Sequence, residues 1–181
     1  MILPPARARI ATSGFTLLEL ALVLALAGLL LTFVVPRLGV IGGVALDSST
    51  RQLATRLRFL REEAARRSTW VRVVFDPAER SYHAEVLVQT TSGPQFTADP
   101  SPLYRRVRLP DSIGLDVSGP GRVTTGDGRP AAILHPDGYA DPVVIHLDDG
   151  EGHEQSIVIE PIAPRPAVFD RRVEIGALPG P

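Results

Sequence analysis

The sequence predicts an α+β fold in which one long N-terminal helix packs on antiparallel β-sheet. An uninterrupted apolar stretch occupies residues 15–35, and leucines at helical spacing follow over residues 46–64. Short strand-like segments separated by Gly- and Pro-rich turns fill the rest of the chain, without alternation of strands and helices. A long helix followed by many short strands is typical of α+β proteins with an antiparallel sheet or sandwich.

The composition fits one folded domain with an added segment, and it excludes several chemistries. The chain has 181 residues, 44% of them hydrophobic, and a net charge of −1, so no strong field attracts nucleic acid or anionic lipid. Every basic residue is arginine, which excludes a Schiff-base lysine and a P-loop lysine. The chain contains no Cys, which excludes thiol nucleophiles, thiolate zinc sites and disulfides. No cofactor is expected.

The apolar stretch 15–35 predicts a transmembrane helix. A helix of this length spans ~30 Å, the thickness of the hydrocarbon core of a bilayer. A cleaved secretory signal normally has an apolar core of ~7–15 residues with small residues soon after it, whereas this stretch continues well past Ala25 and Ala27. Arg7 and Arg9 precede the stretch and no acidic residue does, so we expect the N-terminus in the cytoplasm and the body on the far side.

Glu19 is the one ionisable side chain in this stretch. Inserting a carboxylate near the middle of a membrane costs ~3 kcal/mol, and less near the interface. Neither a cleaved signal nor a simple anchor explains the residue. It therefore predicts a cationic partner.

The motif GFTLLEL, with the proline that follows, resembles the signal of type IV pilins and type II secretion pseudopilins. Gly14 stands at the last leader position, Phe15 at the first mature position, Glu19 at the fifth, and Pro36 where the family often has a helix-loosening proline. The resemblance implies that prepilin peptidase cleaves between Gly14 and Phe15 and methylates the new amine. Residues 1–14 are then the leader peptide.

Cleavage creates a cation that Glu19 can neutralise. Residues 15 and 19 lie one helical turn apart, so the pair can form within one chain. In a helical assembly, Glu19 can instead meet the Phe15 amine of a neighbouring subunit, which removes two unpaired charges at once. The resemblance favours pairing between subunits, with Glu19 and Pro36 as the assembly residues.

Residues 36–68 are expected to form a hinge and an amphipathic helix. Pro36 and the glycines that follow weaken helical structure, which predicts a flexible joint. Apolar residues then recur at steps of seven, four, three and four on one face; they are Leu46, Leu53, Leu57, Leu60 and Ala64. This face is predicted to pack on the body.

Residues 69–181 are expected to form a β-rich domain. Strands over 69–75 and 81–89 flank the turn DPAER and predict a hairpin. Further strands are expected at 103–109, 113–117, 131–135, 142–147, 155–160 and 167–175. The stretch from LREEAARRS to YHAEV and the turn ILHPDGYAD resemble the GspH/FimT branch of the pilin-like family.

Motifs that carry catalytic chemistry are missing. The four histidines, at positions 83, 135, 146 and 153, show no metal-ligand spacing, and no G-x-S-x-G motif orders a triad. The acidic group Asp148, Asp149, Glu151 and Glu154 fits either a calcium site or a solvated turn, and the EF-hand spacing is absent. No metal site is therefore predicted.

Two groups of arginines stand out in the sequence. Arg105, Arg106 and Arg108 alternate with apolar residues and indicate a charged edge strand. Some FimT-like pilins bind DNA through basic C-terminal residues, for which Arg171 and Arg172 are the candidates here. Two arginines on a nearly neutral chain are a small patch, so nucleic acid is not an expected partner.

The resemblance implies a minor pseudopilin of type II secretion: a structural component of the pseudopilus tip, involved in protein export, and not an enzyme. Its expected partners are prepilin peptidase, other major and minor pseudopilins in a hetero-oligomeric filament, and inner-membrane lipid. The expected location is the inner membrane, with a single pass, a cytoplasmic N-terminus and a periplasmic C-terminal domain. The alternatives are a FimT-like minor pilin that aids DNA uptake, and a periplasmic enzyme or binding domain that the helix only tethers.

Overall fold

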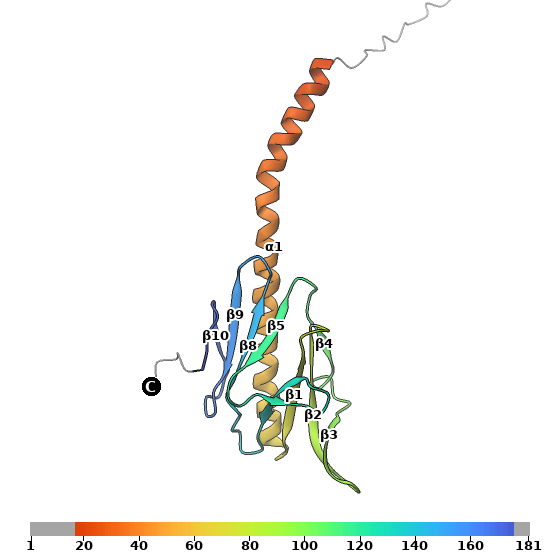
Figure 1. The fold of residues 1–181 in the computed structure, drawn as a ribbon, viewed down its shortest axis with the longest axis vertical. Helices are drawn as coiled ribbons and strands as arrows, with labels where there is room; N and C mark the ends of the chain where they lie inside the picture. The colour runs from red at the N-terminus through yellow and green to blue at the C-terminus, as the bar shows by residue number, and fades with distance from the viewer. Residues whose placement is uncertain (1–16, 176–181) are drawn as a thin grey trace, which may run out of the picture. The chain divides into compact units, whose positions relative to one another are not determined.

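The computed structural model describes residues 17–175, except that the side chains of residues 30–42 are outside this description. The chain has two compact units, Met1–Leu38 and Gly39–Pro181. Among the described residues, helix α1 contributes to both units and ten strands belong to the second (Figure 1). The leader predicted over residues 1–14 lies outside the described residues.

Helix α1 extends from Leu17 to Arg66. It is assigned without interruption over residues 36–43, where the sequence predicts a flexible joint, and the flexibility of that joint stays a prediction. The helix ends in a Schellman motif: Ser68 has a φ of 49°, its N–H donates to Ala65 O at 3.2 Å, and Thr69 N–H donates to Ala64 O at 3.0 Å. These bonds satisfy carbonyls of the last turn and direct the chain into the first strand.

The described side chains of the first unit, at residues 17–29, are all exposed and almost all apolar. Within the described part of the chain, no helix contains a stretch both long and apolar enough to cross a bilayer. The span predicted over residues 15–35 extends beyond the described side chains and stays a prediction.

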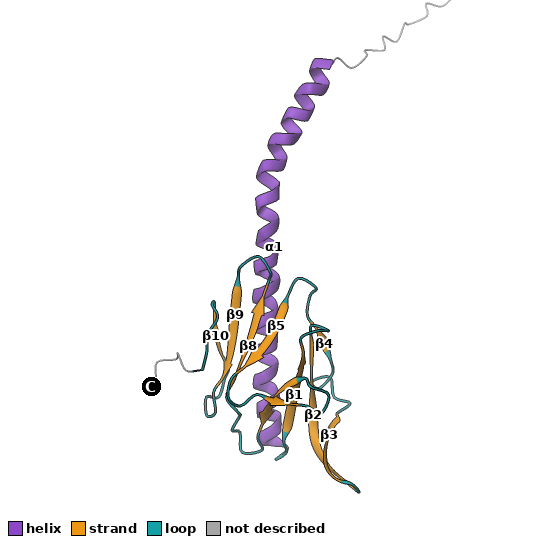
Figure 2. Cartoon of the chain, viewed as in Figure 1, coloured by secondary structure: helices purple, strands orange, loops and turns teal. Residues whose placement is uncertain are grey.

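Two antiparallel sheets form the body (Figure 2). Sheet A has the order β3-β2-β1-β7-β6, with β4 also paired to β2; its strands are β1 (Val71–Asp76), β2 (Ser81–Thr90), β3 (Gly93–Ala98), β4 (Val107–Arg108), β6 (Val123–Thr124) and β7 (Pro130–Leu134). Sheet B has the order β10-β9-β8-β5; its strands are β5 (Gly114–Ser118), β8 (Val143–Asp148), β9 (Glu154–Ile159) and β10 (Ala167–Phe169). The predicted α+β class with antiparallel sheet is confirmed.

One core joins α1 to both sheets. The apolar face predicted on the helix is confirmed, because the side chains of all five predicted residues are buried; these are Leu46, Leu53, Leu57, Leu60 and Ala64. They share a cluster with Phe75 and Tyr82 of sheet A and with Ile145 and Ile157 of sheet B. The amphipathic half of α1 is therefore the common support of the two sheets.

A second, smaller apolar cluster covers the opposite face of sheet B. Val144 of β8 and Val158 of β9 are buried there beneath Val173, which belongs to the segment after β10. The C-terminal segment 170–175 thus lies on the outer face of the sheet and shields it from water.

The observed strands match the predicted ones in the hairpin around DPAER and differ from them in the loop regions. The hairpin around DPAER is confirmed, with β1 and β2 in register from Val71↔Val86 to Asp76↔Ser81. Strands β3 and β6 were not expected. The strand predicted over 103–109 reduces to β4, and the strand predicted over 167–175 reduces to β10. These two strands are shorter than predicted because side chains from other elements form hydrogen bonds with the backbone of those segments.

Candidate functional site

The four residues predicted for processing and assembly lie at the margin of what the structure describes. Gly14 and Phe15 are outside the described residues, and so is the side chain of Pro36. Glu19 is exposed in the first turn of α1. Their roles therefore stay predictions.

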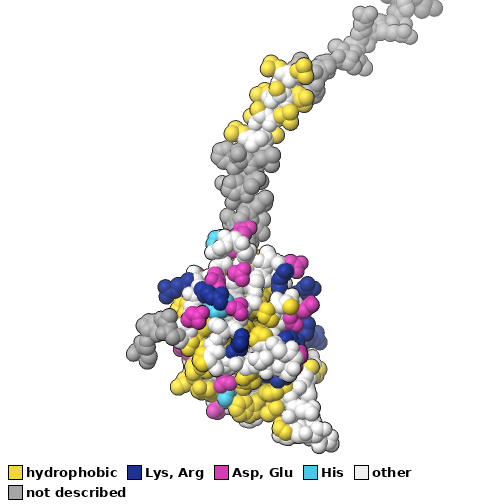
Figure 3. Space-filling model, in the orientation of Figure 1, with side chains coloured by type: hydrophobic (Ala, Val, Ile, Leu, Met, Phe, Trp, Pro, Cys, Tyr) yellow, Lys and Arg dark blue, Asp and Glu magenta, His cyan; other side chains and the backbone are white. Residues whose placement is uncertain are grey.

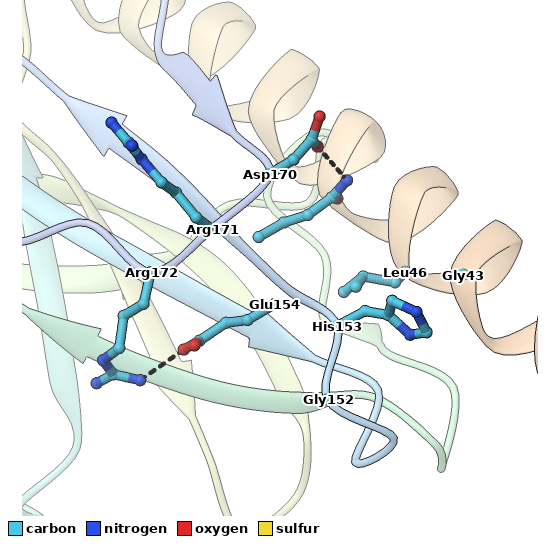
Figure 4. A pocket seen from close by; sticks show the side chains of 9 residues that line it. Gly43, Leu46, Gly152, His153, Glu154, Asp170, Arg171 and Arg172 are labelled. Carbon is cyan, nitrogen blue, oxygen red and sulfur yellow. Dashed lines mark hydrogen bonds and ion pairs between the residues drawn. The ribbon is translucent and has the colours of Figure 1, made fainter.

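The body contains a pocket of about 490 Å³ beside the first turns of α1 that belong to the body. Gly43 and Leu46 form the helical wall, and the opposite wall comes from the β8–β9 turn and the segment after β10 (Figure 4). The polar lining residues are His153, Glu154, Gln155, Asp170, Arg171 and Arg172.

Most of this polar lining is already paired. Arg172 donates to Glu154 at 2.7 Å and to Asp116 of β5 at 2.9 Å, and Gln155 Nε2 donates to Asp170 at 2.8 Å. Hydrogen bonds to Glu154 and to Asp116 raise the pKa of the Arg172 guanidinium. Figure 4 shows the side chain of Arg172 directed to Glu154 and away from Arg171. The pair of arginines weighed as a DNA-binding patch is thus divided, and one member is neutralised by two carboxylates.

The acidic loop 148–154 is a hydrogen-bonded turn. Asp149 is buried; its Oδ1 accepts the N–H groups of Glu151 at 2.9 Å and His153 at 3.1 Å, and its Oδ2 lies 2.6 Å from His153 Nδ1. Burial acts to raise the pKa of Asp149, but these hydrogen bonds outweigh it and hold the pKa below its ordinary value. Among the described residues, no three His, Asp or Glu side chains are grouped so as to hold a metal ion.

His146 is buried on the outer face of sheet B between two serines. Ser156 Oγ donates to Arg171 O at 2.8 Å and accepts from Val173 N–H at 3.1 Å. Since the hydroxyl hydrogen of Ser156 is used, the contact of 3.0 Å between His146 Nδ1 and Ser156 Oγ requires His146 Nδ1–H to be the donor. His146 Nε2 then accepts from Ser118 Oγ at 3.0 Å.

This network holds the C-terminal segment and is not a catalytic triad. No carboxylate hydrogen-bonds His146 among the described residues, and both His146 and Ser156 are sealed from solvent. Burial first, and then the nearby charge of Arg172, lower the pKa of His146 and keep the ring neutral.

The guanidinium of Arg61 is buried in the body. It donates to Gly138 O at 2.6 Å, to Pro161 O at 2.5 Å, to Glu160 O at 3.1 Å and to Ala163 O. Burial lowers the pKa of Arg61, and Asp137 partly opposes that effect. The planar fork of arginine can satisfy carbonyls from two loops at once, which an ammonium group cannot do as well.

Arg56 binds a third loop in the same manner. Its guanidinium donates to Leu103 O at 2.9 Å, to Pro102 O at 3.3 Å and to Arg105 O, and it lies 5.5 Å from the ring centroid of Tyr82. These carbonyls are therefore unavailable to a strand, which explains why the predicted strand 103–109 reduces to β4. The predicted charged edge is confirmed only at Arg108, which lies on β4.

An aromatic group lies where α1 ends. The rings of Trp70 and His135 have centroids 4.2 Å apart, and those of His135 and Tyr139 are 5.0 Å apart in an edge-on arrangement. His135 Nε2 lies 3.1 Å from Asp141 Oδ1. The predicted turn ILHPDGYAD thus carries one ring of this group on each side of its Pro-Asp-Gly.

Local sequence patterns indicate only part of this arrangement. Arg61 falls four residues after Leu57 and one before Glu62, so helical spacing places it beside the core face, but its charge suggested a solvent position. The serines that hold His146 are 28 and 10 residues from it, on separate strands. No local pattern connects them.

The comparisons with known proteins concern the body. The family model described as type II transport protein GspH matches residues 49–162, from the middle of the amphipathic helix to the loop after β9. A search of curated protein sequences found no significant match.

Two solved structures of the minor pseudopilin EpsH, from the type II secretion system of Vibrio cholerae, resemble the chain at 18% identity. One has a TM-score of 0.49 and covers 64% of this chain and 89% of its own. The other has a TM-score of 0.46 and covers 65% and 94%.

Proposed function

This chain belongs to the GspH family of type II transport proteins, and we propose that it is a minor pseudopilin of type II secretion that assembles near the tip of the pseudopilus as a structural subunit. In this proposal residues 15–35 anchor the chain in the inner membrane, with the N-terminus in the cytoplasm and the body in the periplasm. Prepilin peptidase removes residues 1–14 and methylates Phe15.

The family match over the body carries the proposal, and the N-terminal motif adds to it. The match covers the region that folds around α1, whereas the motif GFTLLEL lies outside it, so the two signals are independent. The described side chains from Leu17 to Leu29 are exposed and, apart from Glu19, apolar, as a segment surrounded by lipid or by other helices requires.

A structural role also agrees with the chemistry of the body. The buried histidine is held in a fixed neutral form by two serines, and Arg172 and Glu154 of the pocket pair with each other. Among the described residues, no carboxylate hydrogen-bonds His146 and completes a triad with its serines. The rival proposal, an enzyme tethered by the helix, requires Gly14 and Glu19 to be dispensable.

The first test follows processing and export together. Deletion of the gene should abolish secretion of type II substrates, and the full-length chain should restore it. Intact mass of the membrane-extracted protein should give an N-methylated Phe15 terminus, and Gly14→Val should block cleavage because a branched side chain crowds the scissile bond. A retained Met1, or undisturbed secretion in the deletion strain, would refute the proposal.

The second test concerns Glu19. If the carboxylate pairs with the Phe15 amine of a neighbour, Glu19→Ala leaves a buried amine without a counter-charge, a loss of ~3–5 kcal/mol for a broken buried pair. Membrane insertion should persist, because the change removes a charge from the apolar stretch. Cross-linking to the major pseudopilin and secretion should both fall, and Glu19→Asp should give an intermediate result. Normal assembly of Glu19→Ala would rule out pairing between subunits.

A further inference from the structure

The end of the body where α1 terminates carries an apolar surface, which we name the aromatic pole and define as Trp70, His135, Tyr139 and Ile162. Ile162 is 86% exposed, Trp70 38% and Tyr139 37%. Figure 3 shows hydrophobic side chains gathered over this lower end of the body, while most arginines and carboxylates lie above it. Large apolar side chains that gather at one exposed place often mark an interaction surface.

The aromatic pole is one continuous surface. The ring of His135 contacts the ring of Trp70 on one side and the ring of Tyr139 on the other. Ala140 N–H donates to Pro161 O at 3.1 Å, which joins the loop of Tyr139 to the loop of Ile162. Residues that are far apart in the sequence are thereby placed side by side.

Arg61 holds this surface in shape from beneath. It donates to Gly138 O in the first loop and to Glu160, Pro161 and Ala163 carbonyls in the second. Both loops are fixed to the helix by a single buried side chain. Because both loops are already ordered, binding of a partner here costs little conformational entropy. Aromatic residues on rigid supports are the usual hot spots of interfaces.

Three carboxylates lie in the two loops of the aromatic pole. Asp137 and Glu160 are exposed, and neither forms an ion pair with a side chain in the described part of the chain. Asp141 lies beside His135. An acidic rim around an apolar centre disfavours anionic lipid, and it disfavours a second copy in which two such rims would meet.

We propose that the aromatic pole is the docking surface for the globular body of another pseudopilin, which presents apolar side chains surrounded by Arg or Lys. The apolar centre recognises the partner's apolar side chains, and the acidic rim selects its cations. This inference rests on the proposed function and adds to it the surface and the chemistry of the contact.

The absence of cysteine allows a direct test in the full-length chain. Ile162→Cys introduces the only thiol, at a position with almost no contacts to lose, and a thiol-linked photo-cross-linker can be attached in cells that carry the complete secretion system. Val168→Cys, on β10 and 43% exposed, is the matched control. We expect Ile162→Cys to capture another pseudopilin, identified by mass spectrometry, at least about tenfold more than the control. Capture of a second copy of this chain, of lipid, or of nothing above the control would overturn the inference.

The rim is tested by charge reversal. Asp137→Arg with Glu160→Arg should lower capture through Ile162→Cys by about tenfold, whereas Glu79→Arg, an exposed acid in the β1–β2 turn, should not. Thermal unfolding of each variant checks that the body is intact, and an arginine on the partner changed to glutamate should restore capture. Unchanged capture by the double variant would exclude recognition through the acidic rim.

Different experimental results would refute the docking surface and the proposed function. If deletion of the chain abolishes secretion while Ile162→Ser and the double variant leave both capture and secretion unchanged, the docking surface is wrong and the proposed function stands. If deletion of the chain leaves secretion intact, the proposed function itself is wrong.

Discussion

Arg61 stands at the boundary between the core face and the polar face of α1, and its environment is unusual for a cation. Its partners are carbonyl oxygens of two loops, and no carboxylate hydrogen-bonds it among the described residues. Buried arginine is tolerated only when its donors are satisfied, because an unpaired charge is costly away from water. The residue therefore fixes loop geometry that the sheets alone leave undefined.

Loss of Arg61 should destabilise the body more than loss of any exposed arginine. Arg61→Met keeps the apolar stem but leaves carbonyls of both loops unsatisfied, a cost of ~2–4 kcal/mol. Arg61→Lys should recover only part of this, since one ammonium reaches fewer of the carbonyls. Urea unfolding is the measurement, and Arg51→Met, whose side chain is 76% exposed, should change stability by less than ~0.5 kcal/mol. Equal effects at both positions would contradict this account.

His146 should make the body less stable in mild acid. Its pKa is lowered in the folded body by burial, so between the unfolded pKa near ~6.5 and the lower folded value the unfolded chain binds more protons. Stability is then fully present above pH ~7 and falls as the pH decreases through that window. The charges that face the ring are Arg172, Asp116, Glu154 and Glu174.

The measurement is urea unfolding at pH 7 and at pH 5. His146→Gln should be less stable at pH 7 but should lose less stability between the two pH values. His83, whose pKa burial also lowers, contributes in the same direction and remains in both proteins. The same pH dependence with and without His146 would assign the effect to other groups.

At the scale of elements, the sequence predicted correctly those helices and hairpins whose residue pattern does not depend on distant contacts. The apolar face of α1 was found residue by residue because a buried helical face repeats every 3.6 residues whatever it packs against. The hairpin at DPAER was found because its turn residues determine the register locally. Strand β3 was missed because Thr91, Ser92, Gly93 and Pro94 read as a loop, although Pro94 is tolerated near the start of an edge strand.

Strand ends were missed where side chains from distant elements bind the backbone. Ser156 takes the carbonyl of Arg171 and the N–H of Val173, so the segment after β10 follows a side chain and not a neighbouring strand. Arg56 has the same effect on residues 102–105. Such contacts between distant residues leave no local pattern in the sequence. For the same reason, the aromatic pole and the role of Arg61 beneath it were not predicted.

The C-terminal segment should be necessary for sheet B. Val173 is buried over Val144 and Val158, so Val173→Ser removes apolar burial and places a hydroxyl in the cluster, at a cost of ~2 kcal/mol. The neighbouring exposed residue gives the control, since Glu174→Ser should cost less than ~0.5 kcal/mol. Both are measured by urea unfolding. A neutral Val173→Ser would mean that sheet B is stable without its outer cover.

For the whole molecule, we expect residues 44–181 to fold as a soluble monomer without the N-terminal unit. In the described part of the chain, the core cluster begins at Leu46 with Ala45 packed against it, and both residues are kept in this fragment. Circular dichroism should show mixed structure with strand dominant, and sedimentation should give a single monomeric species. A mostly helical spectrum or an insoluble product would refute the architecture.

The two arginine clamps on α1 also determine how the body responds to mechanical force. Arg56 and Arg61 are separated by ~7.5 Å along the helix axis and by ~140° around it, so they grip loops on different sides. A force applied along the axis of α1 should act on the hydrogen bonds of both guanidinium groups at the same time. These bonds should then share the force instead of breaking one after another. Peeling a single loop outward meets only one clamp. We therefore expect the body to resist extension along α1 better than deformation across it.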